Sequence, residues 1–186
     1  AISIFVFLKG SKKNRNIGFV LFAGALTVWS FGLAQFFSYT DVVSCIFWGN
    51  FLYVGGSFVA ATFLLFSLIY SDDERYLNPW KIILVILPAV FIALIAFSSR
   101  LLIRDVEFIN GYRAFKYGSG RLLWEVQFNL SLAYAFIRFI KLYKVSVGLA
   151  KKQLLYIVTS SLTINIFSGL TNVFLLWFGI FNYIWL

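Results

Sequence analysis

The stretch that decides the fold runs from Cys45 to Tyr70 and reads CIFWGNFLYVGGSFVAATFLLFSLIY. It is 26 residues long and holds no charged side chain. A helix needs about 20 predominantly apolar residues to cross the hydrocarbon core of a bilayer. We therefore expect residues 45–70 to form a membrane-spanning helix.

Apolar blocks of this kind recur along the chain, separated by short charged linkers. They are too long for strands and lack the alternation of apolar and polar residues that strands show. Complete spans are expected at about 17–37, 45–70, 82–97, 122–142 and 154–176, and parts of a first and a last span at 1–8 and 180–186. The sequence predicts an all-α membrane protein, a polytopic helical bundle of about seven spans whose first and last are truncated, with Pro88 kinking one helix.

Composition supports a membrane class and a single domain. Hydrophobic residues make up 61% of the 186 residues, charged residues only 12%, and the mean hydropathy is +0.88. A soluble domain has about 25% charged residues. We interpret residues 1–186 as one transmembrane domain, a fragment of a longer chain located in the cell membrane, with the lipid bilayer as its first partner.

Several kinds of chemistry are excluded by missing residue types. The chain has no His, which rules out His-ligated haem or zinc, catalytic triads and a phospho-accepting His within it. Cys45 is the only Cys, so no internal disulfide or Cys-based metal cluster can form. Three adjacent acids, at 72–74, are interpreted as a solvated helix end. We expect no catalytic residue, metal or cofactor.

Basic residues predict the orientation in the membrane. Of the 16 Lys and Arg residues, 11 lie in or beside the linkers at 9–16, 71–81 and 143–153, and the other five lie in one long connection at 98–121. The positive-inside rule places the first set in the cytoplasm. The N-terminus is then outside, and a complete seventh helix leads to the cytoplasm. The net charge of +9 is explained by this topology, without a nucleic-acid partner.

Polar side chains in the last full span share one face. Ser161, Asn165, Ser168 and Asn172 follow the spacing i, i+4, i+7 and i+11. Polar groups within a membrane serve either as contacts between helices or as functional sites. Two interpretations stay open, a polar helix–helix interface and the wall of a ligand pocket.

The preceding span carries the one acidic residue of an expected helix. Glu125 and Asn129 lie one turn apart on the same face, near the expected outer boundary. Glu125 is either part of a recognition site or an Arg-paired residue at the membrane surface. The lack of a second acid deep in a span argues against a proton- or cation-driven transporter.

The long connection at 98–121 contains a hairpin signal. Asn110-Gly111 separates two short runs rich in β-branched and aromatic residues, one of which begins at Tyr112. We expect a short extracellular β-hairpin, which acts either as a lid over a pocket or as an ordinary ordered loop. The candidate ligand-binding residues are Tyr112, Glu125, Asn129, Asn165, Ser168 and Asn172.

Across nearly its whole length the chain resembles the N-terminal seven-helix membrane region of prokaryotic histidine kinases, which also precedes some diguanylate cyclases. The resemblance lies in diffuse, mostly apolar patterns, none of them catalytic. These are Val28-Trp29-Ser30, 63–70, 76–80, Leu87-Pro88, Gly111-Tyr112, Tyr117-Gly118, 151–156, 169–172 and 178–180. The resemblance implies a sensor input region with its output in a cytoplasmic catalytic domain.

The leading hypothesis is therefore a membrane-embedded signal-sensing domain of a sensor histidine kinase or related receptor. A small-molecule or membrane-borne cue would shift helices, and a homodimeric cytoplasmic output would respond. The alternatives are a small transporter or channel, a non-catalytic membrane subunit, and, less compatible with the missing His, a lipid-modifying enzyme.

Overall fold

The computed structural model describes residues 13–71, 78–109 and 112–169. Within these residues the chain forms five helices, with a two-stranded sheet between the third and the fourth of them. The elements are α2 (Lys13–Ser38), α3 (Val42–Ser71), α4 (Pro79–Ser98), β1 (Ile103–Ile109), β2 (Tyr112–Tyr117), α5 (Gly120–Val145) and α6 (Gly148–Gly169). The chain divides into two compact units, 1–138 and 139–186, with the boundary inside α5. Each unit is described by itself.

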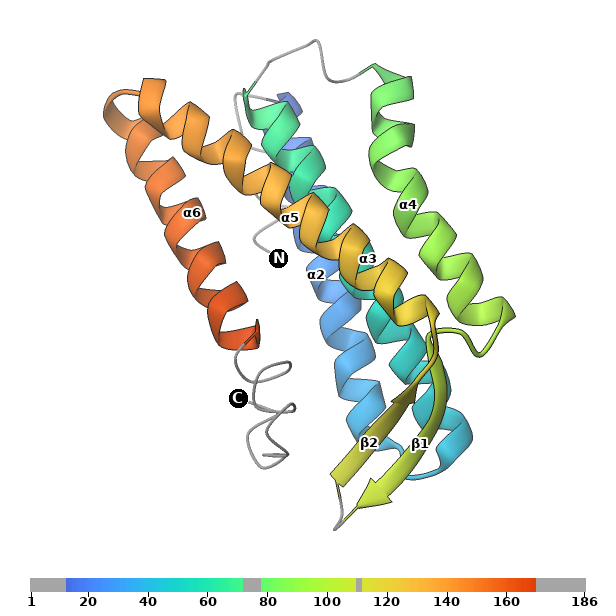
Figure 1. The fold of residues 1–186 in the computed structure, drawn as a ribbon. Coiled ribbons are helices and arrows are strands. Elements are labelled where there is room, and N and C mark those ends of the chain that lie inside the picture. Colours follow the sequence, from blue (N-terminus) through green and yellow to red (C-terminus); the bar gives the residue numbers. More distant parts are fainter. Residues whose placement is uncertain (1–12, 72–77, 110–111, 170–186) are drawn as a thin grey trace. The chain divides into compact units, whose positions relative to one another are not determined.

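Helix α3 is the centre of the first unit. Its apolar window is 72% buried, against 11% for α2 and 17% for α4, and both of these helices pack along it (Figure 1). The difference follows from residue size, because α3 carries Gly, Ala and Ser where its neighbours approach. Small residues let helix backbones come close together in a membrane, where dispersion rather than water exclusion drives association.

Two adjacent glycines in α3 pack against tryptophans of two different helices. A Cβ placed on Gly55 would lie 3.0 Å from Cδ1 of Trp29 in α2. A Cβ placed on Gly56 would lie 3.3 Å from Cζ2 of Trp124 in α5. These glycines therefore serve helix packing on two faces of α3 at once.

Aromatic rings fill the contact between α2 and the second half of α3. The Phe22 ring centroid lies 5.0 Å from that of Phe63 and 6.4 Å from that of Phe66. Phe63 also meets Phe136 of α5 edge-to-face at 5.6 Å. Offset and edge-to-face ring pairs of this kind stabilise a contact by about 0.5–1.5 kcal/mol beyond the area they bury.

Side-chain caps set where α3 and α4 begin. The Ser44 N–H donates to Oδ1 of Asp41 at 2.8 Å, so α3 starts at Val42, three residues before the expected start. Oδ1 of Asn78 accepts from the Trp80 N–H at 3.1 Å, and Pro79 lies in the first turn of α4, three residues before the expected start. Pro88 lies inside α4, and its expected kink stays a prediction.

The two strands expected around Asn110-Gly111 are present and pair antiparallel, from Ile103 opposite Tyr117 to Ile109 opposite Tyr112. A bulge interrupts the register between Ile103 and Asp105. Such an irregularity bends a strand and increases its twist, which lets the short sheet lie against α3.

The sheet is anchored on the first turns of α3. Ile103 and Val106 of β1 are buried in one cluster with Phe36 of α2 and Cys45 of α3. Phe115 of β2 packs on the edge of this cluster. The sheet, the end of α2 and the start of α3 therefore form one apolar unit.

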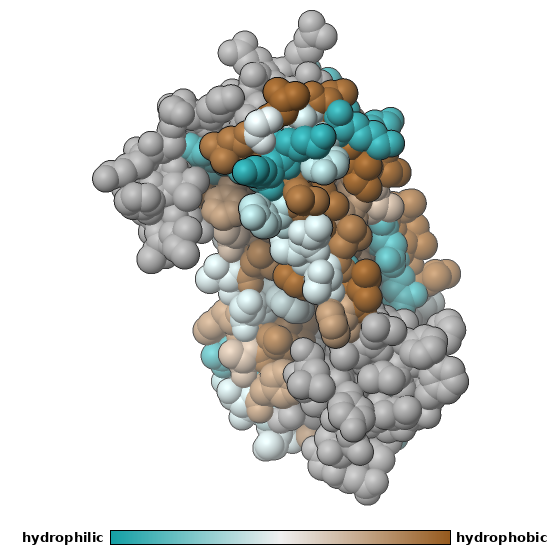
Figure 2. All heavy atoms as spheres, turned by 90° about the vertical axis from the view of Figure 1, so that its left-hand side faces the viewer, coloured by the Kyte–Doolittle hydropathy of each residue, from teal (hydrophilic) through white to brown (hydrophobic). Residues whose placement is uncertain are grey.

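Three described helices are long and apolar enough to cross a membrane: Asn16–Ser38, Val42–Tyr70 and Pro79–Ser98. On the face seen in Figure 2, hydrophobic residues are interspersed with polar ones, and many large apolar side chains of these three helices are exposed. The expected span at 122–142 falls in α5, and the described part of the one at 154–176 falls in α6; charged and hydroxyl side chains lower the hydropathy of both helices. The pieces expected at 1–8 and 180–186, and the acids at 72–74, lie outside the described residues.

The basic linker expected at 143–153 is mostly helical. Helix α5 continues to Val145 and α6 begins at Gly148, which leaves Ser146 and Val147 as the connection. Lysine is a good helix former, so a run of lysines does not end a helix as a run of Gly or Pro would.

A glycine between β2 and α5 permits a close backbone approach. The Gly118 N–H donates to the Leu102 carbonyl oxygen at 3.0 Å, and a Cβ on Gly118 would lie 2.6 Å from the carbonyl carbon of Leu101 and 2.9 Å from the Arg100 oxygen. We predict that Gly118→Ala lowers the thermal midpoint of the purified protein, at a cost above about 1 kcal/mol, because backbone atoms cannot move aside as a side chain can.

The matched control is Gly24→Ala in α2, where an added Cβ meets nothing within 4 Å. This variant should be neutral or slightly more stable, since Ala is the better helix former. Equal midpoints for the two variants would contradict the close approach at Gly118.

The Asp41 cap predicts a dependence of stability on pH. The Ser44 N–H lowers the pKa of this carboxyl below its ordinary value of 3.8. Stability from the ionised cap is therefore complete above the unfolded-state pKa and is lost as the pH falls through the lower folded-state pKa. The thermal midpoint of the parent should approach that of Asp41→Asn, a cap that does not titrate, as the pH falls below about 4. A constant difference between the two from pH 3 to pH 7 would exclude this titration.

Candidate functional site

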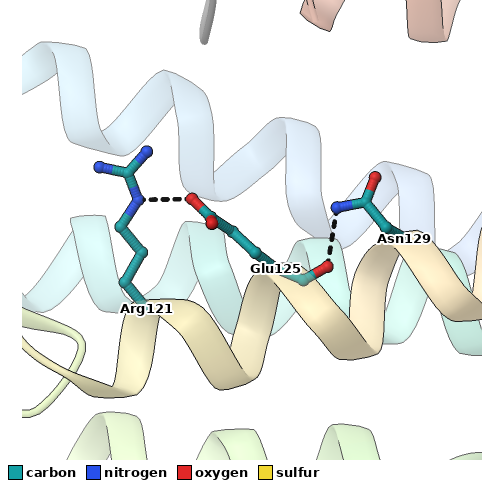
Figure 3. Close-up of polar contacts among 3 residues, drawn as sticks. All are labelled: Arg121, Glu125 and Asn129. Carbon is teal, nitrogen blue, oxygen red and sulfur yellow. Dashed lines mark hydrogen bonds and ion pairs between the residues drawn. The ribbon is translucent and has the colours of Figure 1, made fainter.

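Two of the predicted site residues, Glu125 and Asn129, lie together on the first half of α5 (Figure 3). Arg121 lies one turn before Glu125 in the helix, and its Nε donates to Oε1 of Glu125 at 2.7 Å. Nδ2 of Asn129 donates to the Glu125 backbone carbonyl at 2.7 Å. Glu125 is therefore paired with Arg121, and its part in a recognition site stays a prediction.

The Arg121–Glu125 pair lies beside the sheet. The guanidinium carbon of Arg121 is 3.9 Å from the ring centroid of Tyr117, the last residue of β2. The side chains of Arg121 and Glu125 are 28% and 38% exposed, so water partly screens the pair. The arrangement connects the charge on α5 to an aromatic side chain of the sheet.

The firmest polar contact between helices comes from Trp124. Its indole Nε1–H donates to the backbone carbonyl oxygen of Tyr53 in α3 at 2.7 Å, and the two rings meet edge-to-face at 4.8 Å. Gly56 makes room for the indole. The side chain thus fixes both the separation and the register of α5 on α3.

One turn further along, Gln127 makes a second contact of the same kind. Its Nε2 lies 3.4 Å from the Ser57 carbonyl oxygen of α3 and 3.4 Å from Oγ of Ser131 on its own helix. Both distances are long for a hydrogen bond. The second contact is therefore weaker than the first.

Buried polar atoms surround this helix contact. Three atoms have no protein hydrogen-bond partner in the described part of the chain: Oγ of Ser57, Oε1 of Gln127, and Oδ1 of Asn50, which lies about one turn before Tyr53 in α3. An unpaired buried polar group costs about 1–3 kcal/mol. The α3–α5 contact is consequently held by few strong bonds and contains polar atoms without a protein partner.

The predicted face of α6 is described only in part. Nδ2 of Asn165 donates to the Ser161 carbonyl within α6 at 2.8 Å. The side chains of Ser168 and Tyr112 and the whole of Asn172 lie outside the described residues. Asn165 belongs to the second unit, whereas Glu125 and Asn129 belong to the first. Ligand binding by these six residues stays a prediction.

Sequence reasoning missed Trp124 and Tyr53 as the centre of the helix contact. They are 71 residues apart, and the acceptor is a backbone atom, which no side-chain pattern reveals. The available signal was the Gly55-Gly56 pair, which indicates a close approach without naming the partner. In the described residues, no three Cys, Asp or Glu side chains group as metal ligands.

The fold and this site define a polytopic helical membrane protein in which a short sheet adjoins a polar contact between helices. A family model described as the N-terminal 7TM region of histidine kinase matches residues 1–183. The chain therefore belongs to this family, which confirms the resemblance noted in its sequence. Neither the curated proteins nor the solved structures contain a significant match to it.

The Trp124 hydrogen bond predicts a measurable stability difference. Trp124→Phe keeps an aromatic ring but removes the Nε1–H, and should lower the free energy of unfolding by about 0.6–1.5 kcal/mol, the usual value of such a bond within or outside a membrane. Trp80→Phe is the matched control, because the Trp80 side chain is 72% exposed. Equal losses in the two variants would show that the bond to Tyr53 contributes nothing.

Proposed function

We propose that this chain is the sensor input region of a histidine kinase or related receptor, in which a cue displaces helices and a cytoplasmic domain produces the output. Catalysis then belongs to the cytoplasmic part, and the two copies of a homodimer respond together. The cue is a small molecule or a membrane-borne compound that acts from the side of the sheet. Membership of the histidine-kinase family supports the class.

The α3–α5 contact is the observation that carries the mechanism. Trp124 and Gln127 hold α5 to backbone carbonyls of α3, while Ser57 and Asn50 offer unpaired polar atoms nearby. Because Tyr53 and Ser57 lie one turn apart on α3, a displacement of α5 moves both donors relative to their acceptors together. The contact favours two discrete positions of α5 on α3 over a continuous displacement, because the donors of Trp124 and Gln127 must find acceptors in each position.

The sheet is the element through which a cue reaches this contact. The Gly120 N–H at the start of α5 donates to the Leu101 carbonyl just before β1, at 2.9 Å. Tyr53 also meets Tyr117 of β2 edge-to-face at 6.1 Å. A ligand that moves the sheet therefore acts on both partners of the Trp124 bond.

The energies required are small. A coupling free energy of about 1–3 kcal/mol changes an equilibrium about 5–150-fold. One hydrogen bond between helices in a membrane contributes about 0.6 kcal/mol and at most about 2. Exchange of the Trp124 and Gln127 contacts for others is thus sufficient to switch an output.

The transporter alternative calls for broken half-helices near the middle of the membrane. Over the described ranges, α3 and α4 each run without interruption, including past Pro88. This observation favours the receptor over the transporter.

The test measures output from the complete gene product in native membranes, as transfer of labelled phosphate from ATP to the protein. Trp124→Phe and Gln127→Leu should each change the basal output several-fold, because they alter the balance of the two arrangements. Trp80→Phe should leave the output unchanged. A gene product without any output domain, or equal output from all variants at equal expression, would refute the proposal.

A further inference from the structure

The connection between α5 and α6 is a tight, fixed turn. The Ser146 N–H and Oγ both donate to the Leu142 carbonyl oxygen, at 3.0 and 2.8 Å, which continues the last turn of α5. Gly148 then adopts a φ of 60°, a left-handed conformation that glycine accepts at little cost. This geometry brings the end of α5 and the start of α6 together within the second unit.

Lysines converge on this turn from both helices. Lys141 and Lys144 lie on the last turns of α5, and Lys151 and Lys152 on the first turns of α6, all four exposed. Nζ of Lys151 lies 5.1 Å from the ring centroid of Tyr143, so the two helix ends share this charge. Two lysines therefore precede the connecting residues and two follow them, all within the second unit.

No acidic residue of this part of the chain balances these charges. From Val126 to Leu186 the sequence contains five basic residues and no Asp or Glu. Mutual repulsion among the lysines is relieved only by anions supplied from outside this segment. The charge thus calls for a negatively charged partner.

Exposed aliphatic side chains lie between the lysines and select the kind of anion. Val145, Val147 and Leu149 are 76%, 82% and 72% exposed. A nucleic acid would meet the ammonium groups but leave these side chains in water. The boundary of a bilayer offers phosphates and hydrocarbon at adjacent depths, which suits lysine, tyrosine and aliphatic residues side by side.

We propose that this lysine turn (residues 141–152) is a binding surface for acidic phospholipid headgroups. The ammonium groups of Lys144, Lys151 and Lys152 contact lipid phosphates, and Val147 and Leu149 enter the acyl boundary beneath them. The inference is independent of the signalling role, since it requires neither the α3–α5 contact nor an output domain.

The experiment is a lipid titration of the purified full chain, followed by native mass spectrometry. Phosphatidylglycerol is the acidic probe and phosphatidylcholine the neutral one. Replacement of Lys151 and Lys152 together by Gln should weaken phosphatidylglycerol binding about tenfold or more, given about fivefold per lysine. Phosphatidylcholine binding should not change, and the double replacement by Arg should keep the preference.

Lys116→Gln is the control, because it removes one lysine from β2, away from the turn in sequence. It should leave the preference for phosphatidylglycerol intact. For the unaltered chain, raising NaCl from about 50 to 500 mM should weaken that preference, as screening of charge requires. Because the salt measurement uses the unaltered chain, it tests the proposal even if the Gln variant does not fold.

Three results would overturn the inference. One is an equal affinity for phosphatidylglycerol in the parent and the Gln variant. Another is a preference of the unaltered chain for phosphatidylglycerol that does not change when NaCl is raised from about 50 to 500 mM. The third is lysine-dependent binding of polyglutamate without any preference between the lipids, which would point to an acidic protein partner.

Discussion

The close approach of helices at Gly55 and Gly56 is the constraint on which the first unit depends. Within a membrane the hydrophobic effect does not drive helices together, because lipid tails are as apolar as the helices. Association therefore depends on packing and on hydrogen bonds between helices. The two glycines let Trp29 of α2 and Trp124 of α5 pack closely against two different faces of α3. Only at this separation does the Trp124 indole reach the Tyr53 carbonyl, and only then do Ser57 and Gln127 become buried neighbours. The packing of α3 and the polar site are therefore consequences of the same small residues.

The short sheet adjoins this contact at the beginning of α3 and of α5. Its buried side chains join α2 and α3 through the cluster around Cys45, and the backbone before β1 accepts a hydrogen bond from the start of α5. Arg121 links Tyr117 of the sheet to Glu125 of α5. A force on the sheet is thus applied to α3 and α5 at once. A receptor needs such an element, because a ligand shifts an equilibrium only through contacts that differ between two states.

Local sequence patterns predicted the helices and strands, but they did not predict the contacts between residues far apart in the sequence. Apolar block lengths located α2, α3 and α4, and Asn110-Gly111 predicted the strand pair, because these signals lie within a few neighbouring residues. The N-caps Asp41 and Asn78 make α3 and α4 begin earlier than expected, although the sequence contains both capping residues. The Trp124–Tyr53 bond could not be predicted, since its register depends on how two helices cross. The lysines at 144–152 were interpreted as a linker because charge was taken to end a helix, whereas lysine favours helix and its charge lies at the helix ends.

The most direct measurement of the central claim, that displacement of α5 on α3 carries the signal, is a distance between spin labels on the two helices. Labels at Val43 and Leu122, both exposed, would be placed in the full-length protein with Cys45→Ser, in a bilayer. Pulsed electron resonance would compare the parent with Trp124→Phe, alongside the output of each. We predict that the distance distribution shifts with the output. A changed output with an unchanged distribution would contradict the claim.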